Sequence, residues 1–117
     1  MLDERQVTRL AREGRYDEMA AALSVLCAVP FDVVDRLLRA ERIDPVLILC
    51  KAGGFEWPTV RTVIESRPDR RVVSSQRLDD CLSNYERLSR STAQRVVQFW
   101  QVGQDAGAQS GTADGDN

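Results

Sequence analysis

The chain has 117 residues, 43% of them hydrophobic and 29% charged, and a formal net charge of -2. These values are ordinary for one globular domain, and no apolar run approaches the roughly 20 residues needed to span a bilayer. Because the first residues are charged and amphipathic and lack the apolar stretch of a secretory signal, we expect a cytoplasmic protein without membrane contact.

The chain contains no histidine. Histidine is the commonest general base and a frequent metal ligand, so its absence excludes Ser-His and Cys-His nucleophile pairs and most transition-metal sites. Adjacent acids such as Asp79 and Asp80 are interpreted as solvated charges. We therefore expect a protein that is not an enzyme, with no catalytic residue, cofactor, metal or small-molecule substrate.

Apolar residues recur at helical spacing along the chain, and no segment keeps the alternation of a strand. Seven helices are predicted, at about residues 3–13, 17–28, 31–40, 45–52, 57–67, 75–86 and 91–103. Their inward stripes include Val7, Leu10, Ala11, Met19, Ala20, Leu23, Leu26, Cys27, Phe31, Val34, Leu37, Leu38, Val60, Val63, Ile64, Leu78, Cys81, Leu82, Tyr85, Ala93, Val96, Val97 and Trp100. The helical domain is placed at residues 1–103.

The fourth helix is the most apolar segment of the chain. Asp44 followed by Pro45 is a start signal, with an acid at the N-cap and proline at the first helical position. Residues 46–50 are apolar on every side and could form a buried strand, but the Asp-Pro entry and the Ala-Gly-Gly exit favour a short helix. We expect this helix to lie at the centre of the fold.

Two further boundaries follow the fifth helix. Pro68 closes that helix, and residues 72–73 either pair briefly as strand or, more in keeping with their length, anchor a loop. Ser91 and Gln94 match a capping box at the start of the last helix.

Residues 104–117 are polar, small and Gly-rich, so they bury too little apolar surface to offset the entropy of ordering the chain. We expect them to form a disordered tail.

The three cysteines, Cys27, Cys50 and Cys81, are far apart and lie in apolar helical surroundings. They are too few for a disulfide framework. A free cysteine in such a setting behaves as a small hydrophobic residue. We expect buried thiols in a reducing compartment.

The sequence resembles itself once. Leu26-Cys27 followed by Phe31 parallels Leu49-Cys50 followed by Phe55, and residues 34–38 parallel residues 60–64. Chance similarity between two amphipathic helix pairs is the alternative, since a firm repeat needs three or more units. We predict an all-α fold of about seven short helices, arranged as stacked antiparallel helical hairpins in the manner of an α-solenoid fragment.

Two stretches carry a family resemblance: VPFDVVDRLLRAERIDPVLILCKAGGFEWPTVRTVIESR and YERLSRSTAQRVVQFWQV. They resemble the C-terminal part of an alphaproteobacterial family of unknown function, whose members are HEAT-like helical-repeat proteins. The resemblance covers about residues 5–102 and implies a bacterial cytosolic helical-repeat protein. It brings no catalytic or ligand-binding residues to this chain.

Lys51, Phe55 and Trp57 are the candidate partner-binding residues. Lys51 is the only lysine and follows the apolar helix directly. It could hold a partner's carboxylate or phosphate, but the ordinary outcome is that it snorkels and complements the helix C-terminus. Trp57 begins the fifth helix and could face either the core or a partner.

Arg61, Arg67, Arg70 and Arg71 are the candidate phosphate-binding residues, because arginine clusters bind phosphate groups well. Residues 1–103 are nearly neutral overall, and the segment has no interleaved aromatic platform, so a solvated basic loop is the default interpretation.

These observations predict a non-catalytic protein–protein interaction or regulatory module. A solenoid fragment with few repeats leaves apolar faces at its ends, so we expect a protein partner, or a second copy in a homodimer, to dock near Trp57 and Phe55. The alternative is a nucleic-acid or phosphate-binding regulator that uses the basic segment from Arg61 to Arg77.

Overall fold

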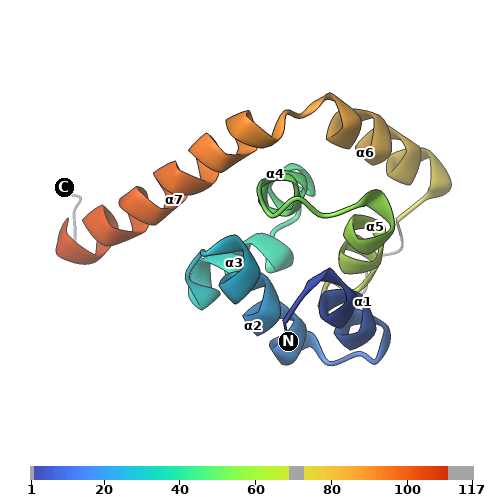
Figure 1. The fold of residues 1–117 in the computed structure, drawn as a ribbon, viewed down its shortest axis with the longest axis horizontal. Helices are drawn as coiled ribbons and strands as arrows, with labels where there is room; N and C mark the ends of the chain where they lie inside the picture. Colours follow the sequence, from blue (N-terminus) through green and yellow to red (C-terminus); the bar gives the residue numbers. More distant parts are fainter. Residues whose placement is uncertain (1, 69–72, 111–117) are drawn as a thin grey trace.

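The computed structural model describes residues 2–68 and 73–110, with side chains as far as Gln101. This part of the chain folds into seven α-helices and contains no strand, which confirms the all-α prediction (Figure 1). The helices are α1 (Glu4–Arg12), α2 (Tyr16–Cys27), α3 (Phe31–Arg39), α4 (Asp44–Ala52), α5 (Trp57–Glu65), α6 (Ser75–Arg87) and α7 (Arg90–Ser110).

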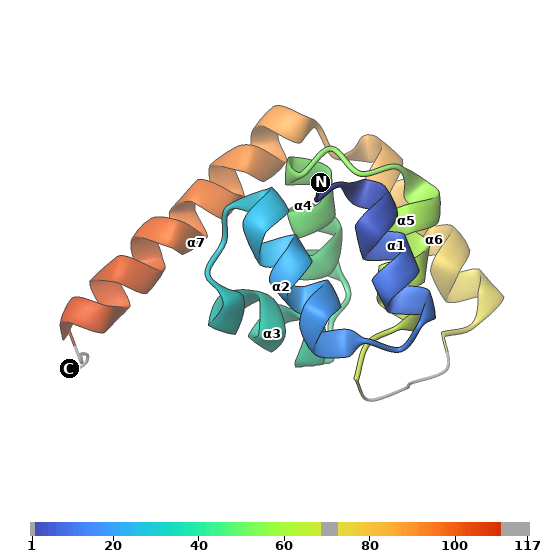
Figure 2. The same cartoon turned by 60° about the horizontal axis from the view of Figure 1, so that its bottom comes forward.

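Helix α4 lies at the centre of the fold, as its apolar sequence predicts. It packs against α2, α3, α5, α6 and α7, which surround it in both ribbon views (Figures 1 and 2). Val46, Leu49 and Cys50 have no exposed surface. A helix that is apolar on all sides is stable in water only when its neighbours cover every side.

Helices that follow one another in the chain pack together from α1 through α6, and α2 also contacts α4. The two predicted helix–turn–helix units, α2 with α3 and α4 with α5, are therefore both present. Helix α1 also packs along α5, which brings the first and fifth helices side by side (Figure 2). No helix in the described residues combines the length and apolar character needed to cross a membrane.

Two predicted helix starts are each displaced in the structure. Ile43, not Asp44, is the N-cap of α4, and Asp44 lies in the first turn with its carboxylate 2.8 Å from Arg42. Ser89 replaces Ser91 at the start of α7, where its hydroxyl accepts a hydrogen bond from the backbone N–H of Thr92. Ser89 thus takes the capping hydrogen bond at α7, whereas at α4 no N-cap side chain makes a capping bond and the Asp44 carboxylate pairs with Arg42.

The buried stripes match the periodicity with one clear exception. Phe31 is 42% exposed, and Val33 is buried in the third helix instead. Phe31 is the first residue of α3, directly after Pro30, and the stripe through Val34 and Leu38 sets which side of the helix faces the core. The prediction that Phe31 is buried is wrong for this reason.

Helix α7 continues to Ser110, beyond the boundary that the sequence suggests near Gln104. No proline interrupts residues 104–110, and their alanines and glutamines are compatible with a helix. Residues 111–117 of the expected tail lie outside the described residues. Val72 does too, whereas Val73 packs against the core as the expected loop anchor.

Candidate functional site

The three candidate partner-binding residues come together around Tyr85 of α6. The Nζ atom of Lys51 lies 4.3 Å from the centre of the Tyr85 ring. The Trp57 ring lies 6.1 Å from the Tyr85 ring, centre to centre, at an angle of 46°. The Tyr85 hydroxyl donates a hydrogen bond to the carbonyl oxygen of Phe55. Sequence periodicity places Tyr85 in the core but gives no sign that it joins these three residues.

This cluster is packed rather than open. Phe55 is only 7% exposed, and Lys51 and Trp57 are half-buried. Burial also raises the pKa of the Tyr85 hydroxyl, so the group remains a hydrogen-bond donor to higher pH than an exposed tyrosine. The cation over an aromatic ring contributes about 0.5–2 kcal/mol. The cluster therefore has an evident role in stability, and Phe55 is not available to a partner in this conformation.

Side chains from three other helices hold the α4–α5 corner, which we define as residues 52–57. Glu4 of α1 accepts a hydrogen bond from the backbone N–H of Glu56 at 2.8 Å. Arg90 of α7 donates to the carbonyl oxygen of Ala52 at 3.4 Å, and Tyr85 supplies the bond to Phe55. Their sequence separations of 52, 38 and 30 residues show that tertiary packing fixes the corner.

The candidate phosphate-binding arginines do not form one exposed cluster among the described residues. Arg61 is exposed on α5 and pairs with Glu65 at 3.4 Å. Arg67 is only 7% exposed and donates to the carbonyl oxygen of Ala40 at 3.2 Å. Arg70 and Arg71 lie outside the described residues.

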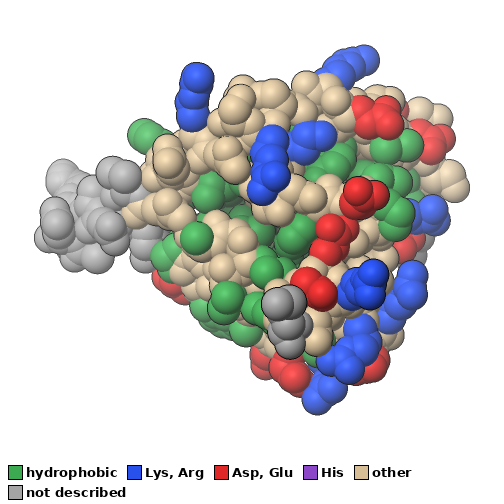
Figure 3. Space-filling model, viewed as in Figure 1, with side chains coloured by type: hydrophobic (Ala, Val, Ile, Leu, Met, Phe, Trp, Pro, Cys, Tyr) green, Lys and Arg blue, Asp and Glu red, His purple; other side chains and the backbone are tan. Residues whose placement is uncertain are grey.

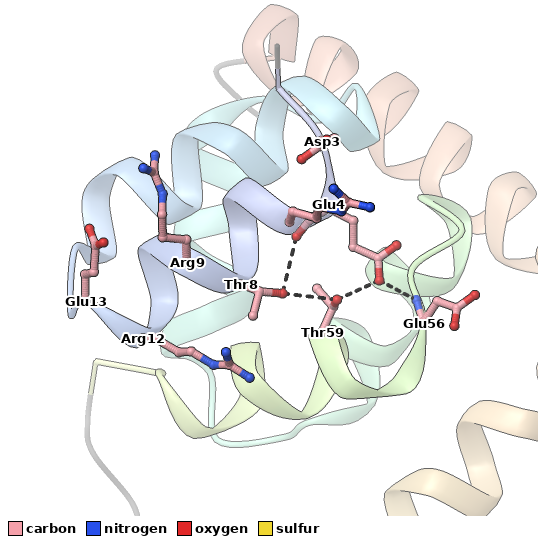
Figure 4. Close-up of a pocket in the computed structure, with 9 residues that line it drawn as sticks. Asp3, Glu4, Thr8, Arg9, Arg12, Glu13, Glu56 and Thr59 are labelled. Atoms are coloured by element: carbon pink, nitrogen blue, oxygen red, sulfur yellow. Dashed lines mark hydrogen bonds between the residues drawn. The ribbon is translucent and has the colours of Figure 1, made fainter.

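An open groove of about 890 Å³ runs between α1 and the start of α5 (Figure 4). Its floor carries a polar network: Thr59 donates to the Glu4 carboxylate at 2.6 Å, and Thr8 donates to the Thr59 hydroxyl at 3.2 Å. Glu4 thus occupies the N-terminus of α5, where the helix dipole favours a negative charge. Sequence reasoning did not identify this groove.

Arg5, Arg9 and Arg12 line the groove from α1. Their spacing of i, i+4 and i+7 places them on one face of the helix, and all three are exposed. In the space-filling view, basic and acidic side chains alternate over the side of the molecule where α1 lies (Figure 3). This spacing was the signal in the sequence that could have drawn attention to the first helix.

The cysteines are free thiols and all are buried, as expected. Burial raises the pKa of Cys27 to about 12 and the pKa of Cys50 well above its ordinary value. Thiols of this kind are poor nucleophiles because the thiolate is the reactive form. Within residues 2–68 and 73–110, no group of three or more Cys, Asp or Glu residues is placed to hold a metal ion.

Comparison with known proteins gives a family and no function. No curated protein matches the chain, and no solved structure matches it. A family model described as an uncharacterised protein conserved in bacteria, DUF2336, matches residues 1–98, which include α1 through α6 and the first part of α7. The chain therefore belongs to the DUF2336 family of bacterial proteins.

Proposed function

We propose that this domain is a non-catalytic protein–protein interaction module of the bacterial cytoplasm, built from HEAT-like helix pairs. The two successive helix–turn–helix units support the repeat interpretation, because stacking of such pairs is how helical-repeat proteins bury their apolar faces. Repeat proteins of this architecture present extended surfaces to other proteins.

One exposed aromatic residue carries the proposal. Phe99 of α7 is 73% exposed, and the half-buried side chains of Val96 and Trp100 lie within one turn of it. We call these three residues the α7 patch. Aromatic side chains are enriched among the residues that dominate protein–protein binding energies. A solvent-exposed aromatic side chain on a regular helix therefore favours a partner-binding role for α7.

The position of α7 supports the same proposal. After its contact with α4, the helix leaves the bundle and its C-terminal half projects from the other helices (Figures 1 and 2). The family match ends at residue 98, directly before Phe99. The match therefore includes Val96 of the α7 patch and leaves out Phe99 and Trp100. Because Phe55 is buried, the α7 patch is a better docking surface than the α4–α5 corner.

Light scattering across a range of protein concentrations, combined with affinity purification from bacterial cells, tests this function. We expect either a dimer or a co-purified protein, with the interaction lost in Phe99→Ser. Phe31→Ser is the matched control, since it makes the same chemical change at an exposed position on α3. A monomer at every concentration, together with partner recovery that Phe99→Ser leaves unchanged, would contradict the proposal.

A further inference from the structure

We propose that the partner of the α7 patch is a second copy of this chain, with the two α7 helices paired in antiparallel orientation. This pairing rests on the proposed function, because it gives the α7 patch a specific partner. Three features of α7 support it: its free side, the residue types along that side, and the distribution of charge along the helix.

Helix α7 has an inner side, which packs on the bundle, and an outer side. Ala93 and Val97 are buried where α7 packs against α4, and Gln101 donates to the carbonyl oxygen of Ala28 on the same side. Phe99 lies two residues from both Val97 and Gln101, which is roughly 160° around the helix from each. Phe99 is therefore on the outer side, where it is 73% exposed. No other described helix covers that side in either ribbon view (Figures 1 and 2).

Uncharged residues follow one another along the outer side at the spacing of a helix pair. From position 92 to position 110 they recur at alternating intervals of four and three residues, which is the period of the contact line between two paired helices. We call these residues the α7 seam: Thr92, Val96, Phe99, Gly103, Ala106 and Ser110. A second helix laid along the α7 seam would cover Phe99, which the other described helices leave in solvent.

The residue sizes along the α7 seam match those of a second copy in antiparallel orientation. With a two-fold axis level with position 101, Phe99 of one copy lies opposite Gly103 of the other, and Val96 lies opposite Ala106. Each larger residue then faces a small one. In a parallel pair Phe99 would instead face Phe99, and Gly103 would face Gly103, which places two rings in one layer and a void in the next. The antiparallel seam is thus self-complementary, as a two-fold interface requires.

The charge along the helix favours the same orientation. Arg95 and Asp105 are the only charged residues from position 91 to position 110. In a parallel pair each would lie level with the same residue of the other copy, and like charges would repel. An antiparallel pair brings the basic half of one helix beside the acidic half of the other, and complementary charges of this kind set the orientation of an interface.

The length of the α7 seam predicts a dimer of modest affinity. From position 92 to position 110 the helix is about 27 Å long and about 10 Å wide. The bundle packs on the inner side of α7, so the contact is confined to one helix from each copy. Standard interfaces bury about 800 Å² of each partner, which is more than one face of such a helix provides. We therefore expect the dimer to dissociate on dilution.

Sedimentation equilibrium of the full chain, between about 1 μM and 1 mM, tests the pairing. We expect a monomer–dimer equilibrium whose dissociation constant rises at least about tenfold in Phe99→Ser. Gly103→Leu should weaken the dimer similarly, because leucine fills the space opposite Phe99, although leucine favours the helix itself. Ala108→Leu is the matched control, since it enlarges a small residue at a position on the inner side of the helix. It should leave the dissociation constant unchanged.

Chemical cross-linking tests the orientation. Val96→Cys and Ala106→Cys are prepared as full chains with different affinity tags and are treated with a short bis-maleimide, separately and mixed. An antiparallel pair should cross-link mainly in the mixture, because position 96 of one copy lies opposite position 106 of the other. The unsubstituted chain is the blank, since its own thiols, Cys27, Cys50 and Cys81, are buried.

Three results would overturn the pairing: a monomer at the highest concentration, a dimer that Phe99→Ser and Gly103→Leu leave unchanged, or equal cross-linking of each cysteine variant alone and in the mixture. A monomer from which affinity purification still recovers a bacterial protein, with recovery lost in Phe99→Ser, also overturns the pairing but leaves the proposed function intact. A dimer weakened by both substitutions, unaffected by Ala108→Leu and cross-linked in the mixture supports the pairing.

Discussion

The carboxylate of Glu4 accepts a hydrogen bond of 2.6 Å from the hydroxyl of Thr59, 55 residues further along the chain. The same carboxylate oxygen accepts the backbone N–H of Glu56, so one acidic side chain on α1 satisfies two donors at the start of α5. Helix α5 has no capping bond from its own N-cap side chain. Glu4 of α1 therefore supplies the capping hydrogen bonds that the N-cap residue of α5 does not make.

Glu4→Ala should lower the free energy of unfolding by about 1–3 kcal/mol, because it leaves the N–H of Glu56 and the hydroxyl of Thr59 without their acceptor. Glu4→Gln should cost less, since the amide oxygen still accepts but the negative charge at the helix N-terminus is lost. Glu13→Ala, on the exposed end of the same helix, is the control and should change stability by less than about 0.5 kcal/mol. Urea denaturation followed by circular dichroism measures all three.

Arg67→Ala should be markedly more destabilising than Arg61→Ala. Arg67 is buried and donates to the carbonyl oxygen of Ala40, so its loss removes both packing and a hydrogen bond, at about 2 kcal/mol. Arg61 is exposed and forms an i, i+4 pair with Glu65, which is worth about 0.3–0.5 kcal/mol. Thermal unfolding of the two variants compares them directly, and equal melting temperatures would show that Arg67 has no structural role.

The stability of the fold should depend on pH through Tyr16 and Asp35. The Tyr16 hydroxyl donates to Oδ1 of Asp35 at 2.6 Å, and Arg39 donates to the same oxygen at 2.9 Å. The bond from Tyr16, followed by that from Arg39, lowers the pKa of Asp35 below its ordinary value of 3.8. Burial, together with the bond to Asp35, raises the pKa of Tyr16 above its ordinary value of 10.0.

The signs of these two shifts define a window of greatest stability. A carboxyl group with a lowered pKa stabilises the fold above about pH 4 and loses that contribution as pH falls through its folded-state pKa. A tyrosine with a raised pKa contributes below about pH 10 and loses its contribution as pH rises through its folded-state value. Tyr16→Phe should flatten both limbs in urea denaturation measured across pH. An unchanged pH profile in this variant would contradict the assignment.

Gly54→Ala should destabilise the fold more than Gly14→Ala. Both glycines have positive φ angles, +76° and +73°, so alanine costs about 1–2 kcal/mol at either position. Only at Gly54 would the new Cβ meet another group, the Cζ atom of Arg90 at 2.9 Å. Displacement of Arg90 would also break its bond to Ala52, adding about 1 kcal/mol. The excess should vanish when both substitutions are compared in an Arg90→Ala background.

The helix boundaries could be predicted from the sequence because they depend on local chemistry. Pro45 lies in the first turn of α4, as its start signal predicts, and the apolar stripes indicate the inward side of most helices. Errors arose where a neighbouring residue competes for the same role, as Ser89 does with Ser91. At such positions two neighbouring residues can each cap the helix, and contacts elsewhere in the fold determine which of them does.

The site could be predicted only in part. Lys51 and Trp57 stood out because of their position beside the central helix, and the structure does bring them together. Their common neighbour, Tyr85, lies on α6. No local pattern in the sequence shows that α6 packs beside Lys51 and Trp57. Glu4 escaped notice because the groups that it binds, Glu56 and Thr59, lie more than 50 residues away in the chain.

Periodicity and helix-end signals act within a few residues, so they are enough to predict that the chain forms helices and that the apolar segment from Pro45 to Ala52 lies among them. Which charged groups have partners within the fold depends instead on how the helices pack. Arg67 is buried against Ala40, Glu4 holds the start of α5, and the arginines of α1 remain exposed. These outcomes depend on contacts between residues far apart in the chain, and no local pattern specifies them.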